Sequence, residues 1–161
     1  MLRRRGIGGL RRSPVDMSDL SLSDAQAIVA QTLAYARANG IRPLGVAVLD
    51  ARGALRAYAA EDGSSLGRAH VAIGKASGSM AMGMGSRTLA KRGREAPQFV
   101  NAVGQLVPGG LIPVPGGVLV RDGAGTLLGA VGVSGDTSDR DEEAAMAGIA
   151  AAGFTGDPGS D

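Results

Sequence analysis

The chain has no cysteine and no tryptophan, and only one of its 161 residues is a histidine. Without cysteine it can form no disulfide, no catalytic thiolate and no cysteine-ligated zinc or iron–sulfur site, and a reducing compartment suits it. Aromatic side chains are also scarce, and the four of them are Tyr35, Tyr58, Phe99 and Phe154. Proteins that stack the bases of single-stranded nucleic acid need more of them, so we expect no nucleic-acid partner.

Long apolar runs are missing too. No stretch reaches the ~18 apolar residues of a membrane span, and the N-terminus lacks the apolar segment of a secretory signal. We therefore expect a soluble, cytoplasmic protein with no membrane partner. The net charge of +2 is uneven, because residues 1–16 hold five arginines and one acid, Asp16. We expect residues 1–18 to be a basic tail that is disordered or that precedes a later natural start at Met17, with a nucleic-acid or anionic-membrane arm as the alternative. Residues 19–153 should form one domain, followed by a polar tail over 154–161.

Turn signals divide the domain into helices and hairpins. Apolar residues at helical spacing predict helices over residues 21–38, 66–84 and 138–152, with short helices starting near 86 and 97. Apolar runs bounded by turn residues predict strands over residues 43–50, 54–60, 118–121 and 126–134. Hairpins grouped between helices indicate an α+β fold with a mostly antiparallel sheet, and not a doubly wound parallel one.

His70 is the only imidazole, so a Ser-His-Asp triad would depend on it, and nothing in the sequence ties a serine to it. It could be an axial ligand to haem iron or a general base. The alternative is an ordinary, partly exposed helix histidine. Met80, Met82 and Met84 alternate and could bind Cu(I) or haem iron, but methionine at an irregular helix end is more often core filler.

Lys75 is the only charged residue in an otherwise apolar helical stretch, residues 71–81. Such a lysine extends to the surface, pairs with an acid or lines a pocket, and burial can make it a base or a Schiff-base nucleophile. Asp62, in the loop before this helix, is a candidate partner, although an Asp-Gly pair also makes turns.

Acidic residues gather where the last predicted strand meets the last helix, at Asp136, Asp139, Asp141, Glu142 and Glu143. They could hold a divalent ion, but helix capping explains them more simply, with Ser138 and Asp141 forming a pair like a capping box. We therefore expect no metal site. Gly116 and Gly117 follow two prolines in a stiff loop of the kind that lines ligand pockets, with a structural turn as the alternative.

Taken in order, these segments resemble the GlcG/HbpS-like family of haem-degrading or haem-binding domains, and they are similar to the C-terminal domain of PduO-type corrinoid adenosyltransferases. The resemblance covers residues 19–153 and is carried by the Leu22 helix, Val46-Ala-Val-Leu-Asp50 with Gly53, Asp62-Gly63, Ala72-Ile-Gly-Lys75-Ala76, Ile112-Pro-Val-Pro-Gly-Gly117, Gly132-Val-Ser-Gly-Asp-Thr-Ser138, Asp141-Glu142 and Ala147-Gly148. It implies a profilin-like sandwich with a five-stranded antiparallel sheet and flanking helices. It also implies homo-oligomers, genes placed among catabolic ones, and haem or another tetrapyrrole for some members.

The function that the resemblance implies is a small ligand-binding protein with haem as its ligand. One histidine excludes bis-histidine ligation within a subunit, so a methionine, Tyr58, Thr137 or a group from another subunit would have to contribute. We expect the ligand between Lys75, the Gly116-Gly117 loop and the junction at residues 134–136, where Ser134 begins the turn. Lys75 would pair with a carboxylate, and the N–H groups after Gly135 would receive an anion.

Two other functions stay open. The first is an enzyme, a lyase, isomerase or hydrolase acting on a small carboxylated or carbonyl metabolite. Lys75 would then be the base or electrostatic anchor, with Asp62 or Asp136 as the acid–base partner. The second is an accessory oligomer without small-molecule chemistry.

Overall fold

The computed structural model describes residues 19–161, so the tail expected over residues 1–18 lies outside the described residues. The elements along the described part are α1 (Leu22–Ala38), β1 (Gly45–Asp50), β2 (Leu55–Ala60), α2 (Arg68–Met82), α3 (Ser86–Glu95), α4 (Pro97–Gly104), β3 (Gly117–Arg121), β4 (Leu127–Ser134), α5 (Ser138–Ala151) and β5 (Thr155–Asp157). None of the helices among residues 19–161 is long and apolar enough to cross a membrane.

The strands form one antiparallel sheet in the order β2-β1-β4-β3-β5. β1 and β2 are one hairpin, β3 and β4 are a second, and the pairing of β1 with β4 joins them, with Val46 opposite Val133. Asp50 closes the first hairpin, because its buried carboxylate accepts the N–H groups of Arg52 and Ala54. The predicted α+β fold with a five-stranded antiparallel sheet is confirmed.

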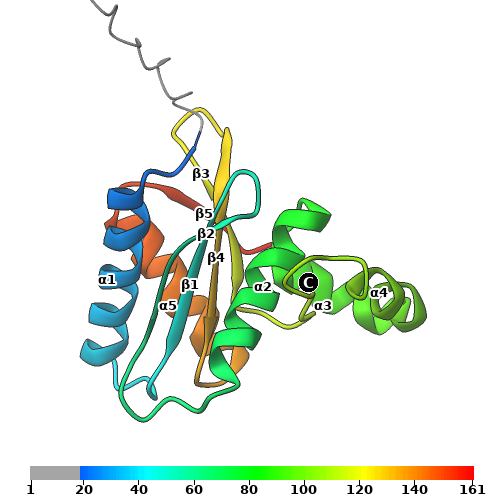
Figure 1. Cartoon of the computed structure of the whole chain (residues 1–161), viewed down its shortest axis with the longest axis horizontal. Coiled ribbons are helices and arrows are strands. Elements are labelled where there is room, and N and C mark those ends of the chain that lie inside the picture. The colour runs from blue at the N-terminus through cyan, green and yellow to red at the C-terminus, as the bar shows by residue number, and fades with distance from the viewer. Residues whose placement is uncertain (1–18) are drawn as a thin grey trace, which may run out of the picture.

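Helices cover both faces of this sheet. Figure 1 shows α1 and α5 side by side on one face and α2 on the other. The larger core lies under α1 and α5, where Ile28 and Ile149 pack against Val46 and Val131, and Leu49 and the residues around it form a smaller core under α2. Burial on both faces explains why the central strands read as continuous apolar runs in the sequence.

α2 lies unusually close to the sheet because glycines face it. A Cβ at Gly132 in β4 would overlap the carbonyl oxygen of Ala72, and a Cβ at Gly117 in β3 would overlap that of Lys75. Only a residue without a side chain allows the helix backbone to approach a strand this closely. This contact places the middle of α2 directly over the strand ends where the candidate site was expected.

The C-terminal segment differs from its prediction. Residues 154–161 were expected to be a polar tail, but they contain β5, whose residues 155–157 pair with residues 119–121 of β3. Beyond it, Pro158 and Ser160 lie against the start of α3, where the Ser160 N–H donates to the Thr88 hydroxyl. A three-residue edge strand of sequence Thr-Gly-Asp has no apolar alternation, so the pattern could not indicate it.

α3 and α4 project from the rest of the molecule beyond α2 (Figure 1), and we call residues 86–104 the helical arm. The arm is basic, because it holds four cationic side chains and one acid, whereas residues 19–161 as a whole carry a small net negative charge. Its root is fixed to the sheet by the Ser86 hydroxyl, which accepts the Gly117 N–H at 2.7 Å. The predicted short helices near 86 and 97 are thus present, and they leave the core.

Candidate functional site

Lys75 lies on the face of α2 that meets the sheet, and only 2% of its surface is exposed. Its ammonium donates to Asp141 Oδ2 of α5 at 2.9 Å and to the Val133 carbonyl oxygen of β4, also at 2.9 Å. One side chain therefore ties the helices on opposite faces of the sheet to the strand that separates them. A buried ion pair of this kind costs desolvation and is retained where its geometry satisfies both charges.

The Gly116-Gly117 loop closes over this ammonium. Gly116 has φ 118°, and a Cβ built on it would lie 2.9 Å from Lys75 Nζ and 2.9 Å from the Val133 carbonyl oxygen. The structure thus brings together Lys75, Gly116 and Gly117, which the sequence predicts to line one ligand pocket. The glycines shield the charge from water, however, and leave no open space beside it for a ligand.

Burial lowers the pKa of Lys75, Asp141 opposes this effect, and the charge of Arg68 adds to it. An enclosed lysine with a lowered pKa resembles a catalytic base in its electrostatics. It differs in access, because a base must come within hydrogen-bond reach of a substrate proton. This arrangement therefore gives no support to the enzyme in which Lys75 acts on a small metabolite.

Asp62 is not the partner of Lys75. It is exposed in the loop between β2 and α2, whereas the buried partner is Asp141, 66 residues away along the chain. The sequence predicts Asp62 as the partner because it lies in the loop just before the Lys75 helix. The contact that forms is set by the packing of α2 and α5 on the same strand end, which a single sequence does not display.

The start of α5 is filled by the protein's own carboxylates. Asp141 Oδ1 accepts the Asp136 N–H at 2.9 Å, and the Thr137 side chain caps the helix by accepting the Arg140 N–H. The sequence predicts that the N–H groups after Gly135 receive an external anion. In the structure the Asp141 carboxylate already accepts the Asp136 N–H. Thr137, and not Ser138, is the N-cap, and Asp141 serves the buried pair instead of a capping box.

Asp136 is held as a carboxylate. It accepts the N–H groups of Arg42 at 2.8 Å and Thr137 at 2.7 Å and also pairs with the Arg42 guanidinium. These hydrogen bonds lower the pKa of Asp136 to about 2. A group that is ionised throughout the neutral range is a poor general acid. The hydrogen bonds of Asp136 instead hold the turn that follows Ser134 and Gly135, both of which are buried.

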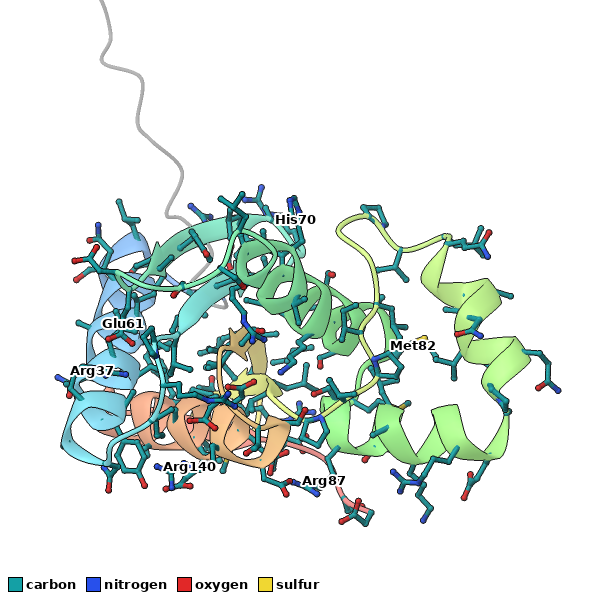
Figure 2. All side chains as sticks on the ribbon, turned by 90° about the horizontal axis from the view of Figure 1, so that it is seen from below. Arg37, Glu61, His70, Met82, Arg87 and Arg140 are labelled. Carbon is teal, nitrogen blue, oxygen red and sulfur yellow. The ribbon has the colours of Figure 1, made fainter. Side chains whose placement is uncertain are left out.

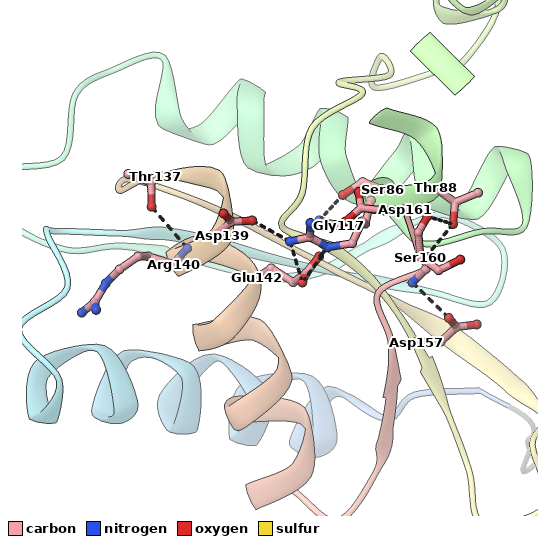
Figure 3. A network of polar contacts seen from close by, with 12 residues as sticks. Ser86, Thr88, Gly117, Thr137, Asp139, Arg140, Glu142, Asp157, Ser160 and Asp161 are labelled. Carbon is pink, nitrogen blue, oxygen red and sulfur yellow. Dashed lines mark hydrogen bonds and ion pairs between the residues drawn. The ribbon is translucent and has the colours of Figure 1, made fainter. Parts of the chain in front are cut away.

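The remaining acids of α5 meet Arg87 of α3, a residue that sequence reasoning missed. Its guanidinium donates to Asp139 at 2.6 Å, to Glu142 at 3.1 Å and to Asp161 at 3.2 Å, and Figure 3 shows these acids where α3 meets α5. The hydrogen bonds to Asp139 and Glu142 raise the pKa of Arg87. Within residues 19–161 no group of three or more His, Cys, Asp and Glu side chains could hold a metal ion.

His70 lies apart from all of these residues. It is exposed near the N-terminal end of α2, at the rim of the molecule in Figure 2. Within residues 19–161 its ring makes no hydrogen bond and no ion pair. Leu66, four residues earlier, is 97% exposed, and Arg68 between them donates to the Ser134 hydroxyl at 3.2 Å. The structure thus divides the predicted ligand-binding residues into a buried cluster around Lys75 and an open surface around His70.

A groove of about 580 Å³ between α1 and β2 has apolar walls that include Leu22, Val29 and Leu33. Tyr58 borders it, but the phenol hydroxyl lies on the other face of the sheet, where a Cβ at Gly45 would be 3.0 Å from it. The groove therefore has a volume typical of ligand sites without an iron ligand pointing into it.

Comparisons with known proteins agree with this fold. The structure of a PduOC–haem complex is 24% identical over 83% of this chain and 94% of its own, with a TM-score of 0.72. HbpS is 28% identical over 92% of this chain and 97% of its own, with a TM-score of 0.71. Protein ORFY of Klebsiella pneumoniae is 19% identical over 89% of this chain and 97% of its own, with a TM-score of 0.73.

A search of curated proteins gives no match. The family model described as haem degrading protein HbpS-like matches residues 20–150, most of the chain and nearly all of its described part. The resemblance seen in the sequence is confirmed, and the chain belongs to the HbpS-like family.

Proposed function

We propose that this protein binds haem at the open surface around His70, and that two copies of the chain together complete the site. The observation that carries the proposal is the state of His70, which is exposed and has no hydrogen-bond partner among the described residues. An imidazole without a hydrogen-bond partner is a usual axial ligand of haem iron. Membership of the HbpS-like family supports haem as the ligand.

The neighbours of His70 suit the apolar ring and the carboxylates of haem. Leu66 offers an almost fully exposed apolar side chain, and Arg68 offers a guanidinium that can pair with a carboxylate such as a haem propionate. Haem bound there would supply an iron centre for oxygen or electron chemistry. One chain offers only one side of such a site, since His70 is its sole histidine and lies on an open surface.

A homo-oligomer is therefore part of the proposal. Large apolar side chains stand exposed on several elements, with Leu66 97%, Leu106 81% and Phe99 53% exposed. The basic helical arm and the acidic remainder of residues 19–161 also carry charges of opposite sign. Exposed apolar side chains and complementary charge favour association between copies. We infer further that the protein acts in the cytoplasm, which the absence of cysteine suits.

The test is a haemin titration of the full chain, followed in the Soret region together with the mass of the complex in solution. We expect saturation near one haem per two chains and a shifted, sharp Soret band that is lost in His70→Ala. Met80→Leu is the matched control, because it removes the other class of iron ligand from the same helix. Non-saturating uptake, or a Soret band unchanged in His70→Ala, would contradict the proposal.

A further inference from the structure

A second cavity lies between the helical arm and the body, and it has about 380 Å³ of free volume. Its walls come from α3, α4, the loop before β3 and the first residue of α5. Their apolar members are Ala90, Pro97, Val100, Pro113, Val114 and Pro115. The cavity is separate from both His70 and Lys75, and none of the functions considered so far uses it.

The elements around this cavity restrict the conformation of its lining residues. Two of its loop residues are prolines, whose backbone is restricted, and Pro97 begins α4. α3 faces the loop, and a Cβ at Gly93 would be in ordinary van der Waals contact with Pro113 Cβ, at 3.5 Å. Val100, on the inner side of α4, is only 4% exposed. A preformed site loses little conformational freedom when it binds, which favours small ligands.

The cavity has few polar side chains, and each of them can donate hydrogen bonds. Arg94 carries the only charge in its lining, and the lining has no acid. The Arg94 side chain is 64% exposed. Within residues 19–161 it makes one long ion pair, 3.8 Å from Nη2 to Asp161 Oδ1, whose own side chain is 68% exposed. The Asn101 amide and the Ser138 hydroxyl also line the cavity and, within residues 19–161, have no hydrogen-bond partner. Three side chains that can donate hydrogen bonds therefore border an open, mostly apolar pocket.

We propose that this cavity binds a small aliphatic carboxylic acid. The planar guanidinium of Arg94 matches a carboxylate in a two-pronged hydrogen bond, and Asn101 and Ser138 can donate to the same group. The aliphatic part would lie against Val100 and the prolines, in a volume near the lower end of known ligand sites. A single cation and mostly apolar walls fit a carboxylate better than a phosphate, which needs several donors around a more strongly charged group.

The experiment is a titration of the full-length, ¹⁵N-labelled protein with butyrate, followed by amide and side-chain signals. We expect saturable shifts at Asn101 and Ser138, and at least a tenfold weaker affinity in Arg94→Gln. Arg92→Gln is the matched control, because Arg92 is exposed on the same helix and does not line this cavity. Arg94→Lys keeps the positive charge but loses the planar pair of N–H donors, so its affinity for butyrate should also be weaker than that of the wild type.

Three results would overturn the proposal. They are the absence of saturable shifts, equal affinity in Arg94→Gln and wild type, and equal affinity for inorganic phosphate and butyrate. Melting curves of each variant separate lost binding from lost folding. The inference does not depend on haem, and the two sites can be told apart because Arg94→Gln should leave the haemin titration unchanged and His70→Ala should leave the butyrate titration unchanged.

Discussion

The substitution Asp141→Asn removes the negative charge of the buried Lys75–Asp141 ion pair and leaves the lysine in place. The amide can still accept the Asp136 N–H, as Asp141 Oδ1 does now. The Lys75 ammonium, 2% exposed, would keep only the Val133 carbonyl oxygen as its acceptor. Removing one partner of a buried ion pair costs about 3–5 kcal/mol, because the other charge stays buried without compensation. In a protein of this size the loss corresponds to about 6–20 °C in Tm.

Urea unfolding followed by circular dichroism measures this loss, with equal m-values showing that the same surface unfolds. The double variant Lys75→Met/Asp141→Asn removes both charges, and we expect it to be more stable than Asp141→Asn alone. Glu143→Gln is the control on the same helix. Glu143 is exposed and accepts the Tyr35 hydroxyl, which the glutamine carbonyl oxygen can still do, so the free energy of unfolding should change by less than about 0.5 kcal/mol.

The same pair gives a pH signature. The pKa of Lys75 is lowered in the folded state, so the unfolded chain binds more protons at alkaline pH. Stability should therefore rise with pH from the lowered folded pKa of Lys75 towards the ordinary lysine value of about 10.4. That rise should vanish in Lys75→Met. If Asp141→Asn costs less than about 1 kcal/mol and the double variant is no more stable, the pair is not a buried, coupled unit and the reasoning fails.

Two further predictions concern the backbone around this pair. Gly132→Ala should destabilise the protein by about 1–3 kcal/mol or more in thermal melting, because its Cβ would overlap the Ala72 carbonyl and push α2 off the sheet, whereas Gly123→Ala, which has open space, should be nearly neutral. No measurable loss in Gly132→Ala would show that α2 is not seated as described. The pKa of Asp136 is about 2 in the fold, so its contribution is complete above about pH 4 and disappears as the pH falls towards 2. Asp136→Asn should therefore flatten the acid limb of the stability profile, and an unchanged limb would contradict the hydrogen bonds assigned to it.

Most of the fold could be predicted because its elements are bounded by residues with strong local preferences. Ser21 and Asp24 form the capping box that starts α1, and Gly83, with φ 67°, ends α2 just after Met82. Such signals depend only on neighbouring residues. β5 lacks them, and it exists because the edge of β3 offers unpaired backbone groups that no short segment of sequence reveals.

The candidate site could be predicted only in part, for a related reason. The sequence placed Lys75 beside the Gly116-Gly117 loop, and the structure brings these residues together. It did not identify Asp141 as the partner, because acids at a helix start are explained well enough by the helix dipole alone. Nor did it indicate that the arm would leave the core, since basic helices with one apolar side occur in both settings.

The order of strands in the sheet has a consequence for how the chain folds. Each hairpin joins neighbouring segments, whereas the β1–β4 seam pairs residues about 80–90 positions apart, with the helical arm inside the intervening stretch. Local hairpins form in microseconds, so closing the seam should limit the folding rate. The cost of that closure grows only slowly with length, by about 0.6 kcal/mol for each doubling. The arm can therefore differ in length among related chains with little effect on how the sheet assembles.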